Sequence, residues 1–180
     1  FPYFSRNIGE FWRRWHISLS SWFRDYLYIP LGGSQEGKWK SIRNIFIIFL
    51  VSGFWHGANW TFIVWGLFHS ILFLPSFLLD TNRKYKSSII GENSLLPSPK
   101  EFIQVGATFL LVTIGWVFFR SETIGDSFQF LSLMFSDFSL ETSFDSIFFY
   151  LLFFIITEYL IRKEERLKEK YFRYDWIVFS

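Results

Sequence analysis

The sequence predicts an all-α, polytopic helical membrane protein, with an amphipathic interfacial helix and a helix break inside the membrane. The first observation is that residues 44–79 contain no Asp, Glu, Lys or Arg, although 19% of the chain is charged. The second is another uncharged run, 102–119, which would span about 27 Å as a helix, close to the ~30 Å hydrocarbon core of a bilayer. Core helices of soluble proteins usually keep one polar face, so these runs favour a membrane protein.

Composition and charge exclude several other classes of protein. Lys and Arg exceed Asp and Glu by only 18 to 16, which is too even a balance for the basic face of a nucleic-acid-binding domain. The hydrophobic content of 51% excludes a disordered charged tail. The chain has no cysteine, which removes disulfides, thiolate nucleophiles and cysteine-based metal sites. We therefore expect a lipid bilayer, and no nucleic acid, as the partner of this chain.

The first expected element is an amphipathic helix over residues 8–29. Its apolar residues follow the i, i+3, i+4, i+7 spacing and cover an arc of about 120°. They are Ile8, Phe11, Trp12, Trp15, Leu19, Trp22, Phe23 and Tyr26. Arginines occupy the opposite side, an arrangement typical of a helix lying at the membrane interface. Pro30 and the glycine pair 32–33 end this helix.

A polar loop, residues 34–43, leads into a membrane hairpin over residues 44–79. The segment Gly57–Asn59 divides this hairpin into a short first part, 44–56, and a longer second part, 60–79. The first part, about 20 Å long as a helix, is too short to cross a bilayer alone, whereas the second part is long enough. A backbone break at membrane depth is tolerated only where its polar groups face protein or a water-filled cavity.

The C-terminal half is expected to contain a cytoplasmic loop (80–101), followed by membrane spans and a charged tail (102–180). The spans are 102–119 and 144–161, separated by a polar loop, and the charged tail begins at residue 162. Basic residues number three in 34–43, four in 80–101 and six in 162–173, but the 120–145 loop has one basic residue among six charges. The positive-inside rule therefore places the 120–145 loop outside and the other three segments in the cytoplasm.

The two ends of the chain carry no targeting signal that we recognise. The sequence starts at Phe1 without a signal-peptide pattern, and it ends where a new apolar stretch, 175–180, begins. We expect a longer multi-pass protein of a bacterial inner (plasma) membrane, with further spans on the N-terminal side.

The three histidines are the candidates for chemistry. His56 lies inside the uncharged run and beside the expected break, and an ionisable group at membrane depth is by default a functional hypothesis. The alternative is a structural histidine that bonds a neighbouring helix. His16 lies at the edge of the apolar arc, where an interfacial anchor is as plausible as a catalytic role. His69 lies in a regular span, where the structural interpretation is favoured.

Other site chemistries are disfavoured. The chain has no HExxH pair and no histidine cluster with zinc spacing, so we expect no metal. The glycine pair 32–33 is not followed by Lys-Ser or Lys-Thr, which argues against a phosphate-binding loop. No G-x-S-x-G motif is present, and the acidic residues lie mostly in loops or the tail, which disfavours a nucleophile elbow or a paired-carboxylate site.

Two blocks carry a resemblance to a known family. The first is FWRRWHISLS (11–20) followed by RDYLYIPLGG (24–33), and the second is GFWHGANW (53–60). Together they resemble the motifs of the membrane-bound O-acyltransferase family, and the IPLGG ending is similar to its alginate O-acetyltransferase branch. The resemblance covers about residues 1–70, whereas residues 80–180 match only in hydropathy.

The resemblance implies a multi-span acyltransferase in which a tunnel joins a cytoplasmic donor to an acceptor outside. Residues 1–79 would then be its catalytic motif region, with His56 in the catalytic role and His16 in a supporting one. We expect transfer of an acetyl group from a thioester, acetyl-CoA or another acetyl thioester, to hydroxyls of an exported polysaccharide or to a partner acetyl-acceptor protein. A buried neutral histidine can accept the hydroxyl proton, which makes His56 the expected general base.

Four further residues are expected to support the site. Asn59 and the backbone at Gly57 are candidates to orient the base or to hold a developing oxyanion, and Trp55 adjoins His56. Arg13 and Arg14 are candidates to bind an anionic donor or, equally, lipid headgroups. Two alternatives to acetyl transfer remain open: D-alanyl transfer to teichoic acid, and a non-catalytic membrane channel or scaffold. The sequence does not identify the polymer or the immediate donor.

Overall fold

The computed structural model describes residues 1–81, 85, 88–92, 96–136 and 146–162. Over these residues the chain is helical and contains no strand, so the predicted all-α class is confirmed. In chain order the elements are the 3₁₀ helix η1 (Pro2–Phe4), α1 (Ile8–Arg14), α2 (Ile17–Phe23), the π-helix η2 (Arg24–Tyr28), α3 (Lys38–His56), α4 (Trp60–Leu78), α5 (Pro99–Arg120), α6 (Ile124–Ser136) and α7 (Ser146–Ile161).

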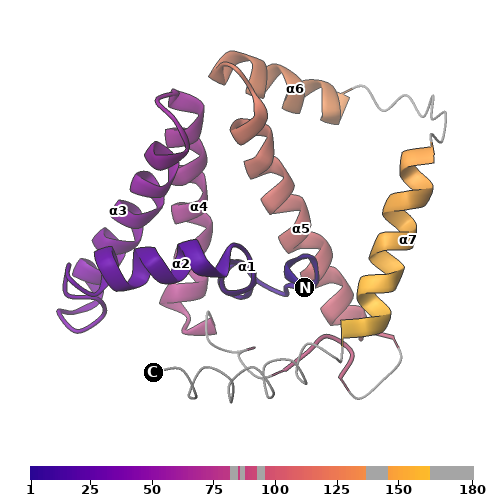
Figure 1. Ribbon diagram of the computed structural model, residues 1–180, viewed down its shortest axis with the longest axis horizontal. Helices are drawn as coiled ribbons and strands as arrows, with labels where there is room; N and C mark the ends of the chain where they lie inside the picture. Colours follow the sequence, from indigo (N-terminus) through magenta and orange to yellow (C-terminus); the bar gives the residue numbers. More distant parts are fainter. Residues whose placement is uncertain (82–84, 86–87, 93–95, 137–145, 163–180) are drawn as a thin grey trace, which may run out of the picture.

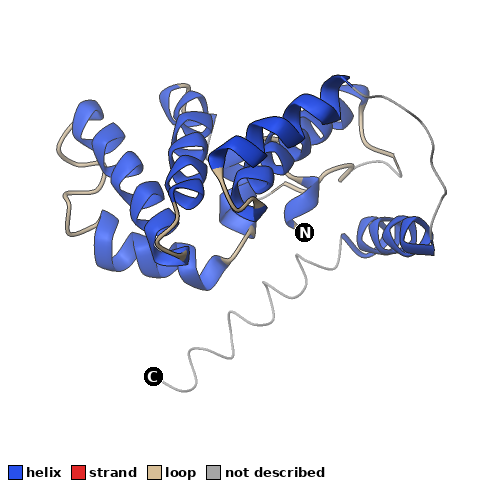
Figure 2. Ribbon diagram, turned by 90° about the horizontal axis from the view of Figure 1, so that it is seen from above, coloured by secondary structure: helices blue, strands red, loops and turns tan. Residues whose placement is uncertain are grey.

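The helices form two layers that cross each other. Figure 1 shows α3, α4 and α5 side by side as the upright layer, with α1 and α2 running across them, and Figure 2 gives the view from above. Among the described helices, α4 and α5 are long and apolar enough to cross a membrane, with 19 and 22 residues. The two apolar helices agree with the predicted helical membrane protein.

Glycines allow α3 and α4 to pack closely. A Cβ atom on Gly53 would collide with the backbone carbonyl of Phe62, and one on Gly66 would collide with the carbonyl of Phe49. Membrane helices associate through such close backbone contacts because lipid supplies no hydrophobic force between them. The two helices therefore form the predicted hairpin.

The break between α3 and α4 falls at Gly57–Asn59, as predicted. Asn59 begins α4 because its Oδ1 accepts a hydrogen bond of 3.2 Å from the backbone N–H of Thr61. Its Nδ2 donates to the carbonyl of Glu122 at 2.8 Å, in the link between α5 and α6. The two bonds of the Asn59 amide therefore hold the break against the start of α4 and against the link that follows α5.

The structure corrects the start of the hairpin. The predicted polar loop 34–43 ends early, because α3 already begins at Lys38. With 19 residues, α3 is about 28 Å long rather than the expected ~20 Å. Charge marks where a helix leaves the apolar region, not where its hydrogen-bond ladder ends, so the charged residues 38–43 remain helical.

The predicted single helix 8–29 is also corrected. It is divided at Trp15 and His16 into α1 and α2, and the turns after Phe23 form the π-helix η2. His16 has φ 46° and ψ 53°, a left-handed conformation that no α-helix accommodates. The predicted apolar side is buried at Phe11 in α1 and at Phe23 in α2, whereas Trp22 and Tyr26 of the same arc are 53% and 69% exposed. A regular spacing of apolar residues does not show whether the backbone between them is one continuous helix.

The C-terminal half differs from prediction in the 120–145 loop, in the start of α5, and in the predicted span 144–161, where α7 has 16 residues and is shorter than the helices that can cross a membrane. The predicted 120–145 loop contains α6, whose Phe128 packs edge-on against Phe118 of α5 at 5.7 Å. The charges of this segment suggested a loop, but α6 forms nevertheless, and its described contact with α5 is made at the N-terminal end, where Ser127 is buried. Helix α5 begins slightly earlier than the predicted span, at Pro99, with Ser98 and Glu101 forming a capping box. The charged tail lies outside the described residues, apart from Arg162.

A buried ion-pair network anchors α1. Glu10 is fully buried and accepts from both Arg6 and Arg14 at 2.9 Å. Arg6 also pairs with Glu101 of α5 at 3.2 Å and donates to the carbonyl of Ser88 at 2.8 Å. Removing one partner of a buried pair leaves an uncompensated charge, so this network holds α1 at one place against α5.

Candidate functional site

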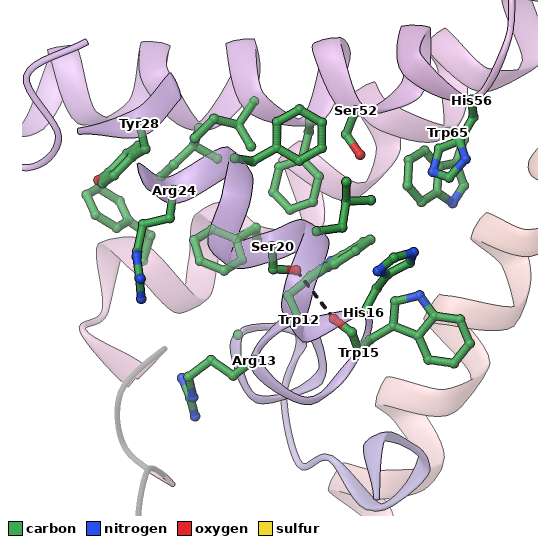
Figure 3. Close-up of a pocket in the computed structure, with 18 of the residues that line it drawn as sticks. Trp12, Arg13, Trp15, His16, Ser20, Arg24, Tyr28, Ser52, His56 and Trp65 are labelled. Carbon is green, nitrogen blue, oxygen red and sulfur yellow. Dashed lines mark hydrogen bonds between the residues drawn. The ribbon is translucent and has the colours of Figure 1, made fainter. Parts of the chain in front are cut away.

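A cavity of about 460 Å³ lies between the crossing segment α1–η2 and the upright helices α3–α5 (Figure 3). Its lining is mostly aromatic and aliphatic, with a small number of polar side chains, as is usual for a small-molecule site. The polar lining residues are Arg13, His16, Ser20, Arg24, Tyr28, Ser34, Ser52 and His56. Both layers of the fold therefore contribute polar groups to one space.

His56 reaches the cavity from the last turn of α3, directly before the break. Its ring is held by edge-on contacts with Trp65 of α4 at 5.5 Å and with Phe119 of α5 at 4.9 Å. Within the described part of the chain, no side chain or carbonyl forms a hydrogen bond to its ring nitrogens. The imidazole is thus oriented by packing, and its nitrogens remain free for a substrate.

His16 reaches the same cavity from the junction of α1 and α2. A non-glycine residue in the left-handed region costs of the order of 1–3 kcal/mol, and such strain clusters at functional sites. Here the left-handed turn lets the chain change direction directly after Trp15. The Trp15 ring is itself fixed, because it stacks on Phe11 and lies tilted against Trp116 of α5, each at 5.5 Å between ring centres. Figure 3 shows the two labelled histidine rings on the same side of the cavity, one from each layer.

Ser52 was not recognised in the sequence. It is buried in α3, one turn before His56, and Figure 3 shows its hydroxyl directed into the cavity. Because residues i and i+4 share one helix face, the available signal was its spacing from His56. A hydroxyl beside an imidazole can donate a hydrogen bond to a carbonyl oxygen bound there.

Only part of the predicted supporting set lines the cavity. Arg13 does, whereas Arg14, Trp55 and Asn59 lie outside its lining. Trp55 is 60% exposed and packs edge-on against the His56 ring at 5.0 Å. Both ends of the Asn59 amide are already engaged in the cap of α4 and the bond to Glu122. Arg14 is paired with the buried Glu10.

The charge of Arg13 is only partly compensated. Burial lowers the pKa of Arg13 from its ordinary value, Glu10 opposes this shift, and the neighbouring Arg14 adds to it. The guanidinium is thus partly removed from water, and no described carboxylate forms an ion pair with it. No three His, Asp or Glu side chains come together in the described ranges in a way that would hold a metal ion.

His69 lies behind the cavity rather than in it. It is 1% exposed, and its ring contacts Trp12 at 5.1 Å and Trp65 at 5.0 Å, two side chains of the cavity wall. Its Nε2 lies so close to Gly115 of α5 that a Cβ there would be 2.6 Å away. Packing therefore holds the His69 ring, and its structural role stays a prediction.

Known proteins match this chain over a wide range of its length. Residues 3–86 match the model of the membrane-bound O-acyltransferase family. A probable alginate O-acetylase of Pseudomonas putida is 45% identical over an alignment of 139 residues that covers 75% of this chain and 25% of the relative. A peptidoglycan O-acetyltransferase of Helicobacter pylori is 40% identical over 133 residues, 74% of this chain and 24% of the relative. A teichoic acid D-alanyltransferase of Bacillus subtilis is 35% identical over an alignment of 131 residues that covers 67% of this chain and 31% of the relative.

Two points follow from these coverages. The chain spans about a quarter of the length of the alginate and peptidoglycan relatives that it matches. The similarity covers 75% of this chain, so it extends beyond the N-terminal range 1–70 to which the motif resemblance was assigned. The expectation that residues 80–180 match only in hydropathy was therefore too narrow.

Proposed function

Because this chain belongs, through residues 3–86, to the membrane-bound O-acyltransferase family, we propose that the protein transfers an acetyl group from a thioester to hydroxyls of an exported polysaccharide. The observation that carries the proposal is that His16 and His56, distant in the sequence, line one cavity between two helix layers. A cavity with two imidazoles, neither of which has a hydrogen-bond partner for its ring nitrogens among the described residues, suits proton transfer to and from a bound substrate.

His56 is the general base in this proposal. Its neutral imidazole accepts the proton of the sugar hydroxyl while the hydroxyl oxygen attacks the thioester carbonyl carbon. A C–O bond forms, the C–S bond breaks, and the thiolate leaves with the proton that His56 returns. The products are the acetyl ester and the free thiol, and His56 ends in its starting state.

The remaining polar groups have supporting roles. His16 orients the acceptor or the base from the opposite layer. The Ser52 hydroxyl donates to the carbonyl oxygen as negative charge develops on it. Asn59 supports the site by holding the break beside His56, and Trp55 by packing on the imidazole. These roles would assign the oxyanion contact to Ser52 rather than to Asn59, whose amide is already engaged.

The proposed setting is a multi-pass protein in a bacterial inner membrane. The donor, acetyl-CoA or another acetyl thioester, enters from the cytoplasm, and the polysaccharide or a partner acetyl-acceptor protein takes the acetyl group outside. The apolar helices α4 and α5 support membrane insertion. The basic residues of 80–101 and the acidic residues of 120–145 support a topology in which the acetyl group moves from the cytoplasm to the outside.

D-alanyl transfer to teichoic acid is the second candidate, since a D-alanyltransferase is among the relatives. It would use the same ester-forming chemistry with a different acyl group. Acetyl transfer is preferred because the alginate relative is 45% identical over 139 residues, against 35% over 131 residues for the D-alanyltransferase.

The test uses the full-length membrane protein in nanodiscs. Acetyl and D-alanyl thioesters are offered separately with a soluble oligosaccharide acceptor, and free thiol and ester product are measured by absorbance and mass spectrometry. We expect acetyl ester to form at the rate of thiol release. Faster use of the D-alanyl thioester would favour the second candidate, and consumption of neither would favour the channel or scaffold.

A further inference from the structure

Arg13 differs from the other arginines that the structure describes as buried or half-buried. Each of the others donates to a named acceptor: Arg6 to Glu10 and Glu101, Arg14 to Glu10, and Arg162 to the carbonyls of Ile90 and Gly91. The Nη2 of Arg13 is buried and has no acceptor within the described part of the chain. A buried guanidinium nitrogen without an acceptor is costly, so the position calls for a partner.

The ion pairs around α1 also single out Arg13 as an arginine without a partner carboxylate in the described ranges. The ion pairs of the described residues around α1 join Arg6 and Arg14 to the carboxylates of Glu10 and Glu101, and Arg13 takes part in none of them. Successive residues of a helix point about 100° apart, so Arg14 reaches Glu10 while Arg13 is directed to the cavity. The positive charge of Arg13 therefore lies in the cavity wall.

The position of Arg13 within the cavity indicates what it would bind. Figure 3 shows the guanidinium groups of Arg13 and Arg24 on the side away from His56 and Trp65. Arg24 is already paired with Asp25 at 2.7 Å, so Arg13 is the cation with capacity for a new anion. The rest of the cavity lining, between these two ends, is mostly aromatic and aliphatic.

We propose that Arg13 binds a phosphate group, and that this phosphate belongs to the thioester donor, whose reactive end then lies near His56. The inference rests on the proposed function. A guanidinium presents two parallel N–H groups to phosphate oxygens, which favours phosphate over a neutral polar group. The phosphate of a lipid headgroup has the same chemistry, so the experiment must separate the two sources.

The test compares two donors that differ only in the phosphate: acetyl-4′-phosphopantetheine and acetyl-pantetheine. The full-length protein, its Arg13→Gln and Arg13→Lys variants, and Arg14→Gln as the neighbouring control are assayed in phosphatidylcholine and in phosphatidylglycerol nanodiscs. For the wild type we expect kcat/KM to favour the phosphorylated donor by about 10- to 100-fold, the range of one charge-assisted contact. Arg13→Gln should abolish this preference through KM, while Arg13→Lys should retain part of it.

The control and the remaining outcomes decide between interpretations. Arg14→Gln should lower the amount of folded protein and affect both donors equally, because it breaks the pair with Glu10. If the donor preference is absent but Arg13→Gln removes a dependence on phosphatidylglycerol, the bound phosphate is a lipid headgroup and the assignment to the donor is overturned. If Arg13→Gln lowers kcat/KM equally for both donors in both lipids, the proposal of a phosphate site at Arg13 is overturned. Absence of turnover in the wild type would instead contradict the proposed function.

Discussion

His16 and His56 reach one cavity from two helix layers that cross each other, although they lie far apart in the chain. His16 is positioned by a left-handed backbone turn, and His56 by the end of α3 at a backbone break. Neither arrangement is the continuation of a regular helix. The site therefore forms where both layers interrupt their hydrogen-bond ladders.

Replacing His56 tests the general base. We expect His56→Ala to leave the protein inserted but to lower acetyl transfer by at least ~100-fold, because general-base catalysis contributes about 10²–10⁴ in rate. The measurement is acetyl ester on the polymer from cells with matched membrane abundance of wild type and variant. His69→Gln, outside the cavity lining, serves as the histidine comparison. Near-normal acetylation by His56→Ala would eliminate the base assignment and favour a scaffold.

Two substitutions at His16 separate its strain from its function. We expect His16→Ala to reduce activity without abolishing it, because His16 supports the reaction rather than carrying the proton transfer. His16→Gly should lose the same activity yet unfold at a higher temperature than His16→Ala, since glycine adopts the left-handed conformation without the cost of about 1–2 kcal/mol. Tryptophan fluorescence during heating in detergent measures the difference. A loss as complete as that of His56→Ala would show that His16 is itself essential.

Close packing of α3 on α4 predicts opposite effects for two glycine substitutions. Gly53→Ala should destabilise the protein, because the added Cβ collides with the carbonyl of Phe62 and the two helices must separate. Gly106→Ala, in α5, meets no atom within 4 Å and should stabilise by about 0.5–1 kcal/mol through helix propensity. Midpoints of thermal unfolding in the same detergent compare the two variants. Equal midpoints would contradict the close contact.

The two ends of α5 test the topology. We predict that the segment after α5 faces outside and that its start faces the cytoplasm. Cysteines introduced as Glu122→Cys and Lys100→Cys lie at exposed positions at opposite ends of this helix, in a chain without native cysteine. An impermeant maleimide should label Glu122→Cys in intact cells, and Lys100→Cys only after permeabilisation. The reverse pattern would invert the assignment.

The sequence by itself determined the features that depend on residues close to one another along the chain. The uncharged runs predicted helices that suit a bilayer, and Gly57–Asn59 predicted where the hairpin breaks, because glycine and asparagine interrupt a helix locally. The pairing of His56 with that break, and the motif blocks around it, identified the candidate site and the family before any contact was known.

Only the tertiary structure decided the left-handed turn at His16, the place of Ser52 in the cavity, and the difference between Arg13 and Arg14. Hydrophobic spacing indicates which side of a segment is apolar, but it does not fix the dihedral angles at the residue where the segment divides into two short helices. Arg13 and Arg14 are adjacent and alike in the sequence. They differ here because Arg14 forms an ion pair with Glu10, which Arg6 also contacts, whereas Arg13 forms no ion pair among the described residues. Whether a side chain supports the fold or faces a substrate depends on groups that distant segments bring to it, and the packing of α1 against α4 and α5 supplies those groups.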